Sequence, residues 1–169
     1  MTAFIALLRA VNVGGTGALP MSELRDLCEA LGFKGARTYI QSGNVVLESR
    51  LSEAEVKAAL EEALASRMGK PVGVMVRTAT EMAAVLAGNP YPNGKPSHTY
   101  VMFLDEPPAE GVLEGVVAPD GEELAVGTRE IYVHYARGMG TSKLKVPGAK
   151  AGTARNMNTV AKLVEMAAR

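Results

Sequence analysis

Polar residues that could bind a charged ligand occur in three stretches that lie far apart along the chain. In the first, Arg9 and Asn12 interrupt an apolar run and lead into a loop with three glycines, among them Gly14 and Gly15. Successive glycine N–H groups can turn toward one point and form an anion-binding nest, although the spacing matches no standard phosphate-binding loop. The alternative interpretation is that the glycines only permit a turn from strand to helix.

The second stretch is a short turn with an amide side chain on either side. Gln41 and Asn44 flank the pair Ser42-Gly43. Turn chemistry itself favours Ser and Gly, whereas it explains the two flanking amides less well. We therefore count Gln41 and Asn44 among the candidate ligand-binding residues.

The third stretch is a basic, glycine-rich loop that leads into a helix predicted over residues 153–168, with Thr153 as its N-cap. The loop carries Lys143, and Arg155 and Asn156 then fall in the first turn of the helix. A cation in the first turn opposes the helix dipole, and a bound anion or a carboxylate would remove that conflict. The alternative is a solvated loop with ordinary surface lysines.

Patterns typical of catalysis or of metal binding are not visible. His, Cys, Asp and Glu do not cluster at metal-ligand spacing, no nucleophile elbow occurs, and nothing indicates a cofactor. We expect a protein that binds a small anionic ligand, phosphorylated or nucleotide-like. One alternative is an enzyme that acts on such a ligand, with His98 or Tyr39 as the proton carrier. Another is a protein-interaction module in which the same motifs are purely structural.

Composition supports a small-molecule ligand more than a polyanion. The 169 residues have zero formal net charge, but residues 105–130 hold eight acidic residues and one basic, whereas residues 131–164 hold six basic and no acidic residues. A single cysteine fits a reducing cytoplasm, and no apolar run is long enough to cross a membrane. The sequence does not indicate an oligomeric state.

The elements that must position these residues follow a regular order. A continuous apolar run from Phe4 predicts a strand covered on both faces, at the centre of a sheet. Capping-box patterns at Ser52 and Thr78 predict two helix starts. The first half is expected to contain, in order, strand 4–8, helix 20–31, strands 36–41 and 44–48, a helix from 52 that ends at Gly69, strand 72–77 and a short helix closed by Gly88.

The second half repeats this order without a closing strand. Its expected elements are strand 99–104, a weak helix over 107–117, a hairpin of 123–126 with 130–136, and helix 153–168. We therefore predict an α+β protein of two fused ferredoxin-like (β-α-β-β-α-β) halves, residues 1–88 and 97–169, with antiparallel or mixed sheets and helices on one face.

A ferredoxin-like sheet is also the frame of a common RNA-recognition domain, which stacks bases on aromatic residues of two central strands. Here the corresponding runs, 4–8 and 44–48, contain one aromatic residue, Phe4. We therefore do not expect nucleic-acid binding of that type.

The motifs resemble the landmarks of one bacterial family, catalogued as domain of unknown function 1697. They are Leu8 to Gly15, Thr38 to Val45, Asn89-Pro90-Tyr91, Ser142-Lys143-Leu144 and Thr153 to Thr159. The resemblance implies an α+β fold of ferredoxin-like character in a small cytosolic protein, and it implies no established activity. Members of that family usually have tryptophan where this chain has Met157. If that ring packs on a ligand in relatives, the role is weakened here, whereas if it only fills the core, methionine is an adequate substitute.

Overall fold

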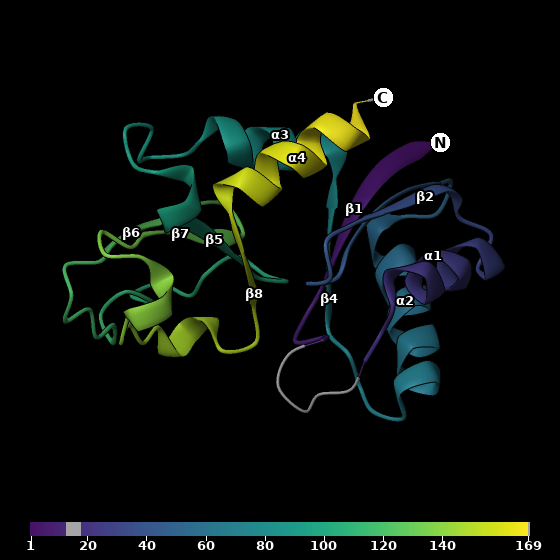
Figure 1. The fold of residues 1–169 in the computed structure, drawn as a ribbon, viewed down its shortest axis with the longest axis horizontal. Helices are drawn as coiled ribbons and strands as arrows, with labels where there is room; N and C mark the ends of the chain where they lie inside the picture. The colour runs from purple at the N-terminus through teal and green to yellow at the C-terminus, as the bar shows by residue number, and fades with distance from the viewer. Residues whose placement is uncertain (13–17, 169) are drawn as a thin grey trace. The chain divides into compact units, whose positions relative to one another are not determined.

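A computed structural model describes residues 1–12 and 18–168, which form four α-helices and two four-stranded antiparallel sheets (Figure 1). The fold is therefore mixed α+β, as predicted. The chain divides into two compact units, one made of residues 1–83 with 163–169 and the other of residues 84–162. Each unit contains one of the two sheets.

The sheet of the first unit is organised around its N-terminal strand. Its strands are β1 (Thr2–Leu8), β2 (Lys34–Tyr39), β3 (Asn44–Ser49) and β4 (Val74–Thr78), in the order β2-β3-β1-β4. Residues 4–8 of β1 are at most 3% exposed. Because side chains alternate between the two faces of a strand, this burial means that both faces are covered, which confirms the central strand predicted from the apolar run.

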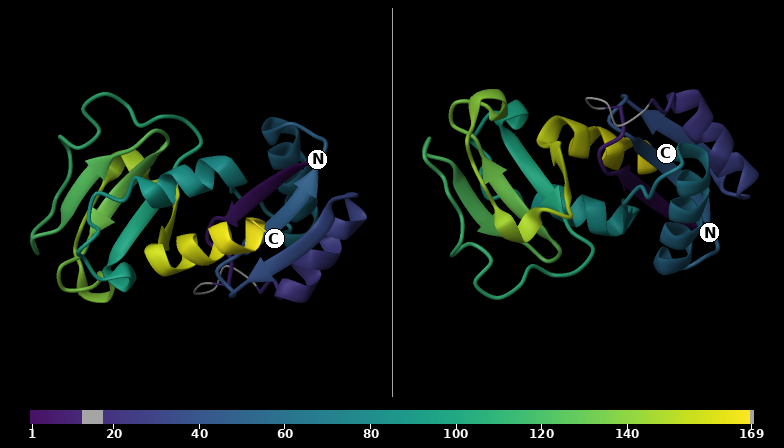
Figure 2. Two further views of the ribbon diagram at one scale, coloured as in Figure 1. Left: turned by 90° about the horizontal axis from the view of Figure 1, so that it is seen from above. Right: turned by 90° about the horizontal axis from the view of Figure 1, so that it is seen from below.

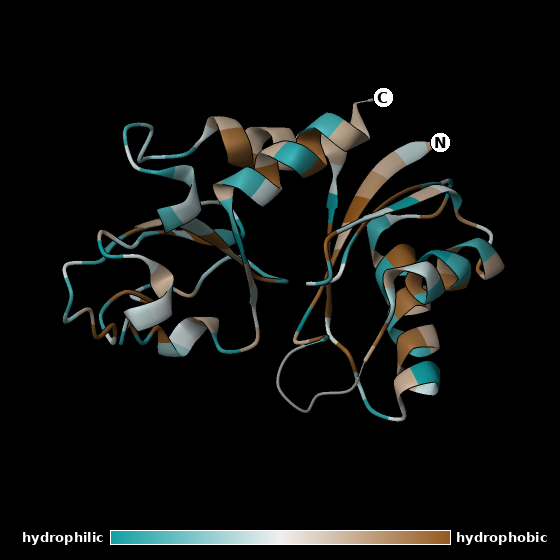
Figure 3. Cartoon of the chain, viewed as in Figure 1, coloured by the Kyte–Doolittle hydropathy of each residue, from teal (hydrophilic) through white to brown (hydrophobic). Residues whose placement is uncertain are grey.

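Two helices, α1 (Met21–Ala30) and α2 (Glu53–Met68), cover one face of this sheet (Figures 1 and 2). Their apolar residues join those of the strands in one core, visible as brown segments of the strands and of α2 in Figure 3. The helical members of this core are Leu24, Cys28, Val56, Leu60 and Leu64. They recur at intervals of four residues along each helix, which places them on one side of it.

The ends of α2 follow the predicted signals. The Ser52 hydroxyl accepts a hydrogen bond from the Glu55 N–H, and the Glu55 carboxylate accepts one from the Ser52 N–H. These hydrogen bonds lower the pKa of Glu55. Gly69 ends the helix with a φ of +72°, a left-handed conformation that glycine adopts at little cost.

The sheet of the second unit has the same strand order as the first: the second, third, first and fourth strands along the chain lie side by side. Its strands are β5 (Thr99–Phe103), β6 (Glu123–Val126), β7 (Glu130–His134) and β8 (Thr153–Asn156), in the order β6-β7-β5-β8. The other helices of the chain are α3 (Ala79–Ala87), α4 (Met157–Ala167) and the short 3₁₀ turns Pro96–His98, Met139–Thr141 and Pro147–Ala149. The capping box at Thr78 is present at the start of α3.

The weak helix expected over residues 107–117 is absent, because this segment forms successive turns. Gly111 has a φ of +75°, and Gly111 with Gly115 would destabilise a helix by about 1 kcal/mol each relative to alanine. Val112 and Leu113 instead pack against the buried core of the second sheet, which contains Leu104, Ile131, Val133 and Tyr135.

The expected helix over residues 153–168 also needs correction, as does the expectation that the second half has no closing strand. Residues 153–156 form β8, which pairs with β5 in a register that sets Arg155 opposite Val101. The helix α4 begins at Met157, and the Asn156 side chain accepts a hydrogen bond from the Thr159 N–H at 3.0 Å. Asn156, and not Thr153, is therefore the N-cap residue.

Candidate functional site

Three segments meet at the C-terminal end of β1 in the first unit. The Leu8 N–H donates to the Gly43 carbonyl at 2.8 Å, and the Arg9 N–H donates to the Gly73 carbonyl at 2.9 Å. The Asn12 Nδ2 group donates to the Gln41 carbonyl at 2.9 Å. We call this junction of residues 9–12, 40–44 and 72–73 the β1 end. It brings together four of the predicted site residues, Arg9, Asn12, Gln41 and Asn44.

The backbone at the β1 end is strained. Ala10, Asn12 and Ile40 have φ values of 54°, 57° and 47°, and within residues 1–12 and 18–168 no other residue except glycine has a positive φ. Asparagine tolerates this left-handed conformation, but a β-branched residue such as Ile40 rarely adopts it. Strained residues persist where the surrounding structure holds them, and they gather at ligand-binding and active sites.

Two of the predicted amides hold this strained backbone in place. The Asn12 side chain accepts from the Leu19 N–H at 2.6 Å and donates to the Leu19 carbonyl at 2.8 Å. Asn44 is fully buried, and its Nδ2 group donates to the Tyr39 carbonyl and to the Ser42 hydroxyl, both at 2.9 Å. Asn12 and Asn44 therefore have structural roles as clamps, whatever else they contact.

Arg9 and Gln41 differ from these clamps because they are exposed. The stem of Arg9 lies over Gly73, since a Cβ atom at Gly73 would be 3.7 Å from the Arg9 Cβ and Cδ atoms. The Gln41 side chain makes no hydrogen bond to the described part of the chain, so its amide can reach a ligand. Gly14 and Gly15, predicted to supply backbone N–H groups here, lie outside the described residues.

The charge of the β1 end is positive. Residues 9–12, 40–44 and 72–73 include Arg9 and no acidic residue, and Lys70 lies two positions before the last of these segments. The Asn12–Leu19 hydrogen bonds also bring the start of α1 to this end, and a helix N-terminus carries a partial positive charge. The acidic residue in the first turn of α1, Glu23, forms a salt bridge with Arg67 of α2.

The other predicted residues, Lys143, Arg155 and Asn156, belong to the second unit. Lys143 is exposed and follows Ser142, whose hydroxyl donates to the Glu122 carboxylate at 3.0 Å. Asn156 caps α4. Lys143 lies in a loop, as predicted. Arg155 and Asn156 were predicted in the first turn of the last helix, and the structure places both in β8, at the end of which Asn156 caps α4.

Arg155 is only 6% exposed, and its Nη1 group donates to the Thr153 hydroxyl at 2.7 Å and to the Ala154 carbonyl at 2.9 Å. Burial lowers the pKa of Arg155 to about 10, so it stays charged at neutral pH. The predicted position of Arg155 in the first turn of the last helix is wrong, because Arg155 lies in β8, one residue before the N-cap Asn156.

The two candidate proton carriers lie in different units. Tyr39 is the last residue of β2 and adjoins Ile40 at the β1 end. His98 ends the 3₁₀ turn before β5, and its carbonyl accepts from the Tyr135 N–H at 2.8 Å. In the described part of the chain, no three His, Cys, Asp or Glu side chains gather to hold a metal ion, and no helix is long and apolar enough to cross a membrane.

Sequence reasoning missed Ala10 and Ile40, and no sequence signal marks them. A left-handed backbone conformation is normally predicted at Gly, Asn or Asp, whereas isoleucine predicts a negative φ. Hydrogen bonds between distant segments, together with those of the Asn44 side chain, hold the backbone around these two residues in place.

Comparisons with known proteins support the family resemblance and the α+β fold. A family model described as "Protein of unknown function (DUF1697)" matches residues 1–132. A solved structure described as that of a conserved bacterial protein from Streptococcus pneumoniae is similar with a TM-score of 0.80 and 25% identity, over 98% of each chain. No curated protein matches the chain in sequence. The family match confirms the resemblance stated from the motifs, and neither description names a ligand or a reaction.

Proposed function

Because the chain belongs to the DUF1697 family, whose description assigns no activity, we propose a function from the geometry alone: the first unit binds a small anionic ligand at the β1 end. The ligand class is a phosphorylated metabolite or a nucleotide. The observation that carries the proposal is the strained backbone, since Ala10, Asn12 and Ile40 gather beside exposed Arg9.

Electrostatics supports an anion over a cation or a neutral ligand. Arg9 and Lys70 lie on segments without any acidic residue, and the start of α1 adds a partial positive charge. A guanidinium group can bind phosphate or carboxylate oxygens through two parallel hydrogen bonds. Arg9 is therefore the residue that we expect to contact the anion directly.

The other residues of the β1 end have different roles in this proposal. The Gln41 side chain supplies a neutral donor and acceptor at the rim. Gly14 and Gly15 lie outside the described residues and stay predicted ligand residues. Asn12 and Asn44 act as positioning residues, because their side chains hold the loop that contains Arg9 and the turn that contains Gln41. The proposal does not depend on Lys143, Arg155 and Asn156, which stay predicted ligand residues of the second unit.

We also infer that both halves, residues 1–88 and 97–169, are ferredoxin-like. Supporting this, the two sheets share one order relative to the chain, β2-β3-β1-β4 and β6-β7-β5-β8. The second sheet has turns and loops where the first has helices packed on one face. For the compartment we propose the cytoplasm, because the one cysteine, Cys28, is a free and buried thiol.

A ligand titration tests the proposal at Arg9. Inorganic phosphate and ATP are titrated at constant ionic strength, and binding is read from amide shifts of residues 9–12 and 40–44 and from the melting temperature. We expect saturable shifts there that weaken about tenfold or more in Arg9→Gln, because one charged hydrogen-bonding partner is lost.

The matched control is Arg50→Gln. Arg50 is exposed and follows β3 at the opposite end of the sheet, where Ser49 pairs with Thr2. This variant removes the same charge and should leave binding unchanged. If phosphate and ATP give no saturable shift at the β1 end, or if both variants weaken binding equally, the proposal is wrong.

A further inference from the structure

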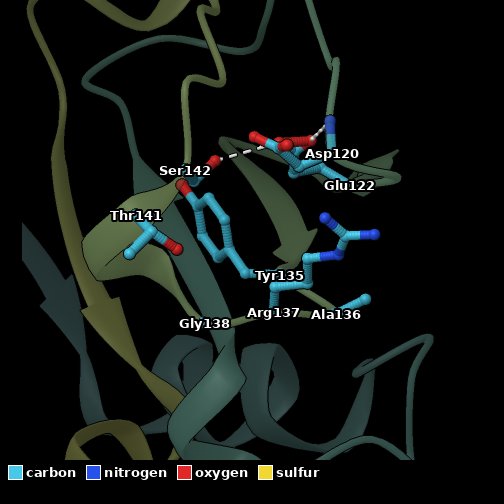
Figure 4. Close-up of a pocket in the computed structure, with 8 residues that line it drawn as sticks. All are labelled: Asp120, Glu122, Tyr135, Ala136, Arg137, Gly138, Thr141 and Ser142. Carbon is cyan, nitrogen blue, oxygen red and sulfur yellow. Dashed lines mark hydrogen bonds between the residues drawn. The ribbon is translucent and has the colours of Figure 1, made fainter.

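A small pocket lies wholly within the second unit, beside the residue that follows β7 (Figure 4). Its interior holds about 10 Å³ of free volume, which is room for one group the size of a water molecule. The residues that line it are Asp120, Glu122, Tyr135, Ala136, Arg137, Gly138, Thr141 and Ser142. The loop of residues 141–142 belongs to the third basic stretch, which the proposed anion site does not use.

The Glu122 carboxylate is a buried negative charge on one wall of this pocket. Glu122 is 9% exposed, its Oε1 atom accepts from the Ser142 hydroxyl at 3.0 Å, and its Oε2 atom accepts from the Asp120 N–H at 3.0 Å. No salt bridge joins it to a described residue, and the Arg137 guanidinium lines the same pocket without forming one. A buried carboxylate is costly unless a positive group pairs with it.

Tyr135 supplies the second indication of a ligand. It is 5% exposed, and its hydroxyl reaches toward the side of the pocket formed by Thr141 and Ser142 (Figure 4). This hydroxyl has no hydrogen-bond partner in the described part of the chain, and it is accessible from the pocket, so it can accept a hydrogen bond from a group that enters there. The ring is fixed edge-on against Tyr100, with 5.5 Å between ring centroids.

The phenol is also neutral under ordinary conditions. Burial, with the nearby Tyr100 and Glu122, raises the pKa of Tyr135 to about 12. Its oxygen therefore keeps a lone pair for a donor that enters the pocket, without adding a second full charge to that of Glu122.

We propose that this pocket binds the primary ammonium group of a small molecule. An ammonium group is about the size of a water molecule and has three N–H donors and no acceptor. The wall offers three matching oxygen acceptors: the Glu122 carboxylate, the Tyr135 hydroxyl and the Thr141 hydroxyl. An anion would instead meet the carboxylates of Asp120 and Glu122, and a divalent metal ion would lack the six oxygen ligands that Mg²⁺ or Ca²⁺ requires.

Arg137 limits what the rest of that molecule can be. It lines the same pocket, is exposed, and forms no salt bridge with the described residues. A second positive group on the ligand would be repelled by this guanidinium, whereas a carboxylate or phosphate beside the amine would pair with it. The ligand class is therefore a small amphoteric molecule, with an amine inside the pocket and an acidic group at its mouth.

The test starts with methylammonium chloride, the smallest probe with the required head group. Binding is followed by amide shifts of Gly138, Thr141 and Ser142 at constant ionic strength, with tetramethylammonium chloride as the matched control without N–H groups. We expect saturable shifts with methylammonium alone. Equal shifts with both salts, or none with methylammonium, would overturn the proposal.

Two pairs of variants identify the contacts. Tyr135→Phe should weaken binding about fivefold, because one hydrogen bond is lost, whereas Tyr100→Phe in the same ring pair should not change it. Glu122→Gln should weaken binding by more than about tenfold. Its control is Glu106→Gln, which removes one exposed acidic charge from the same unit and should leave binding unchanged. Should Glu122→Gln fail to fold, the Tyr135 pair still decides, since an unchanged affinity in Tyr135→Phe refutes the site.

A comparison of ligands tests the role of Arg137. Phosphoethanolamine should bind more tightly than methylammonium, and ethylenediamine more weakly, and Arg137→Gln should remove this ranking while methylammonium still binds. The opposite ranking would refute the amphoteric ligand class. Because this pocket and the β1 end are read from different amides, failure of one proposal is distinguishable from failure of the other.

Discussion

At Gly43 the backbone has a φ of +88°, and a Cβ atom there would lie 2.7 Å from the Val11 Cγ2 atom and 2.8 Å from the Leu8 Cβ atom. Both neighbours are buried and neither can move away freely. Glycine is therefore required for two separate reasons, its left-handed backbone and the close approach of the turn to β1. This position is what allows residues 40–44 to reach the β1 end.

We expect Gly43→Ala to destabilise the protein by about 3 kcal/mol, the sum of left-handed strain and overpacking. Gly32 is the matched control, because it has a φ of +85° with no atom within 4 Å of the added Cβ. Gly32→Ala should cost about 1 kcal/mol, from the backbone alone. Urea unfolding followed by circular dichroism measures both, and equal losses would contradict the steric argument.

Ile40 has a left-handed backbone conformation that its β-branched side chain does not explain. It is 49% exposed, so its left-handed backbone is not compensated by burial of the side chain. We expect Ile40→Gly to be more stable than Ile40→Ala by about 1 kcal/mol, since both remove the side chain and only glycine accepts this φ freely. The same urea experiment applies. Equal stability of the two variants would mean that the backbone at residue 40 is not strained.

At the scale of single elements, residues 153–156 show how a sheet edge competes with a helix. Thr153 and Arg155 are buried and alternate with partly exposed neighbours, the period-two pattern of a strand. Pairing with β5 satisfies their backbone groups, and the helix then starts one turn later than local signals suggested.

The corrected start of α4 gives a direct prediction. Asn156→Ala should destabilise the protein by about 1 kcal/mol, because the Thr159 N–H loses its cap, and Asn156→Asp should retain most of the stability. Thermal unfolding of the two variants checks this. If Asn156→Ala has no effect, Asn156 does not act as the cap.

At the scale of the whole molecule, Cys28 reports on the opening of the first core. It is fully buried, and burial, with nearby Glu29 as a smaller effect, raises the pKa of its thiol to about 12. Both effects suppress the reactive thiolate. The thiol should therefore react only when the core around it opens.

We expect an aromatic disulfide reagent at pH 8 to modify Cys28 in the folded protein about a thousandfold more slowly than in urea-unfolded protein. Because the chain has one cysteine, each modification event has a single source. Gly43→Ala should accelerate the reaction by about a hundredfold, because a loss of about 3 kcal/mol raises the population of the opened state by that factor. Reaction of the folded protein at the unfolded rate would mean that Cys28 is not buried in solution.

Local sequence signals determined most of the elements of this protein. The apolar run of β1, the capping boxes at Ser52 and Thr78 and the stop at Gly69 act through neighbours a few residues away, so they are readable from the chain itself. The family motifs likewise identified the family. The failures, at 107–117 and 153–156, occurred where packing against a sheet outweighed weak local helix signals.

The tertiary structure alone decided which polar residues share a place and which do not. Arg9, Asn12, Gln41 and Asn44 meet at the β1 end because hydrogen bonds join segments about 30 residues apart in the chain, and those bonds also hold Ile40 in a conformation that its residue type disfavours. Folding likewise places the neutral hydroxyl of Tyr135 and the buried Glu122 carboxylate on the wall of one pocket. Burial and long-range pairing depend on the complete chain, and no short stretch of sequence encodes them.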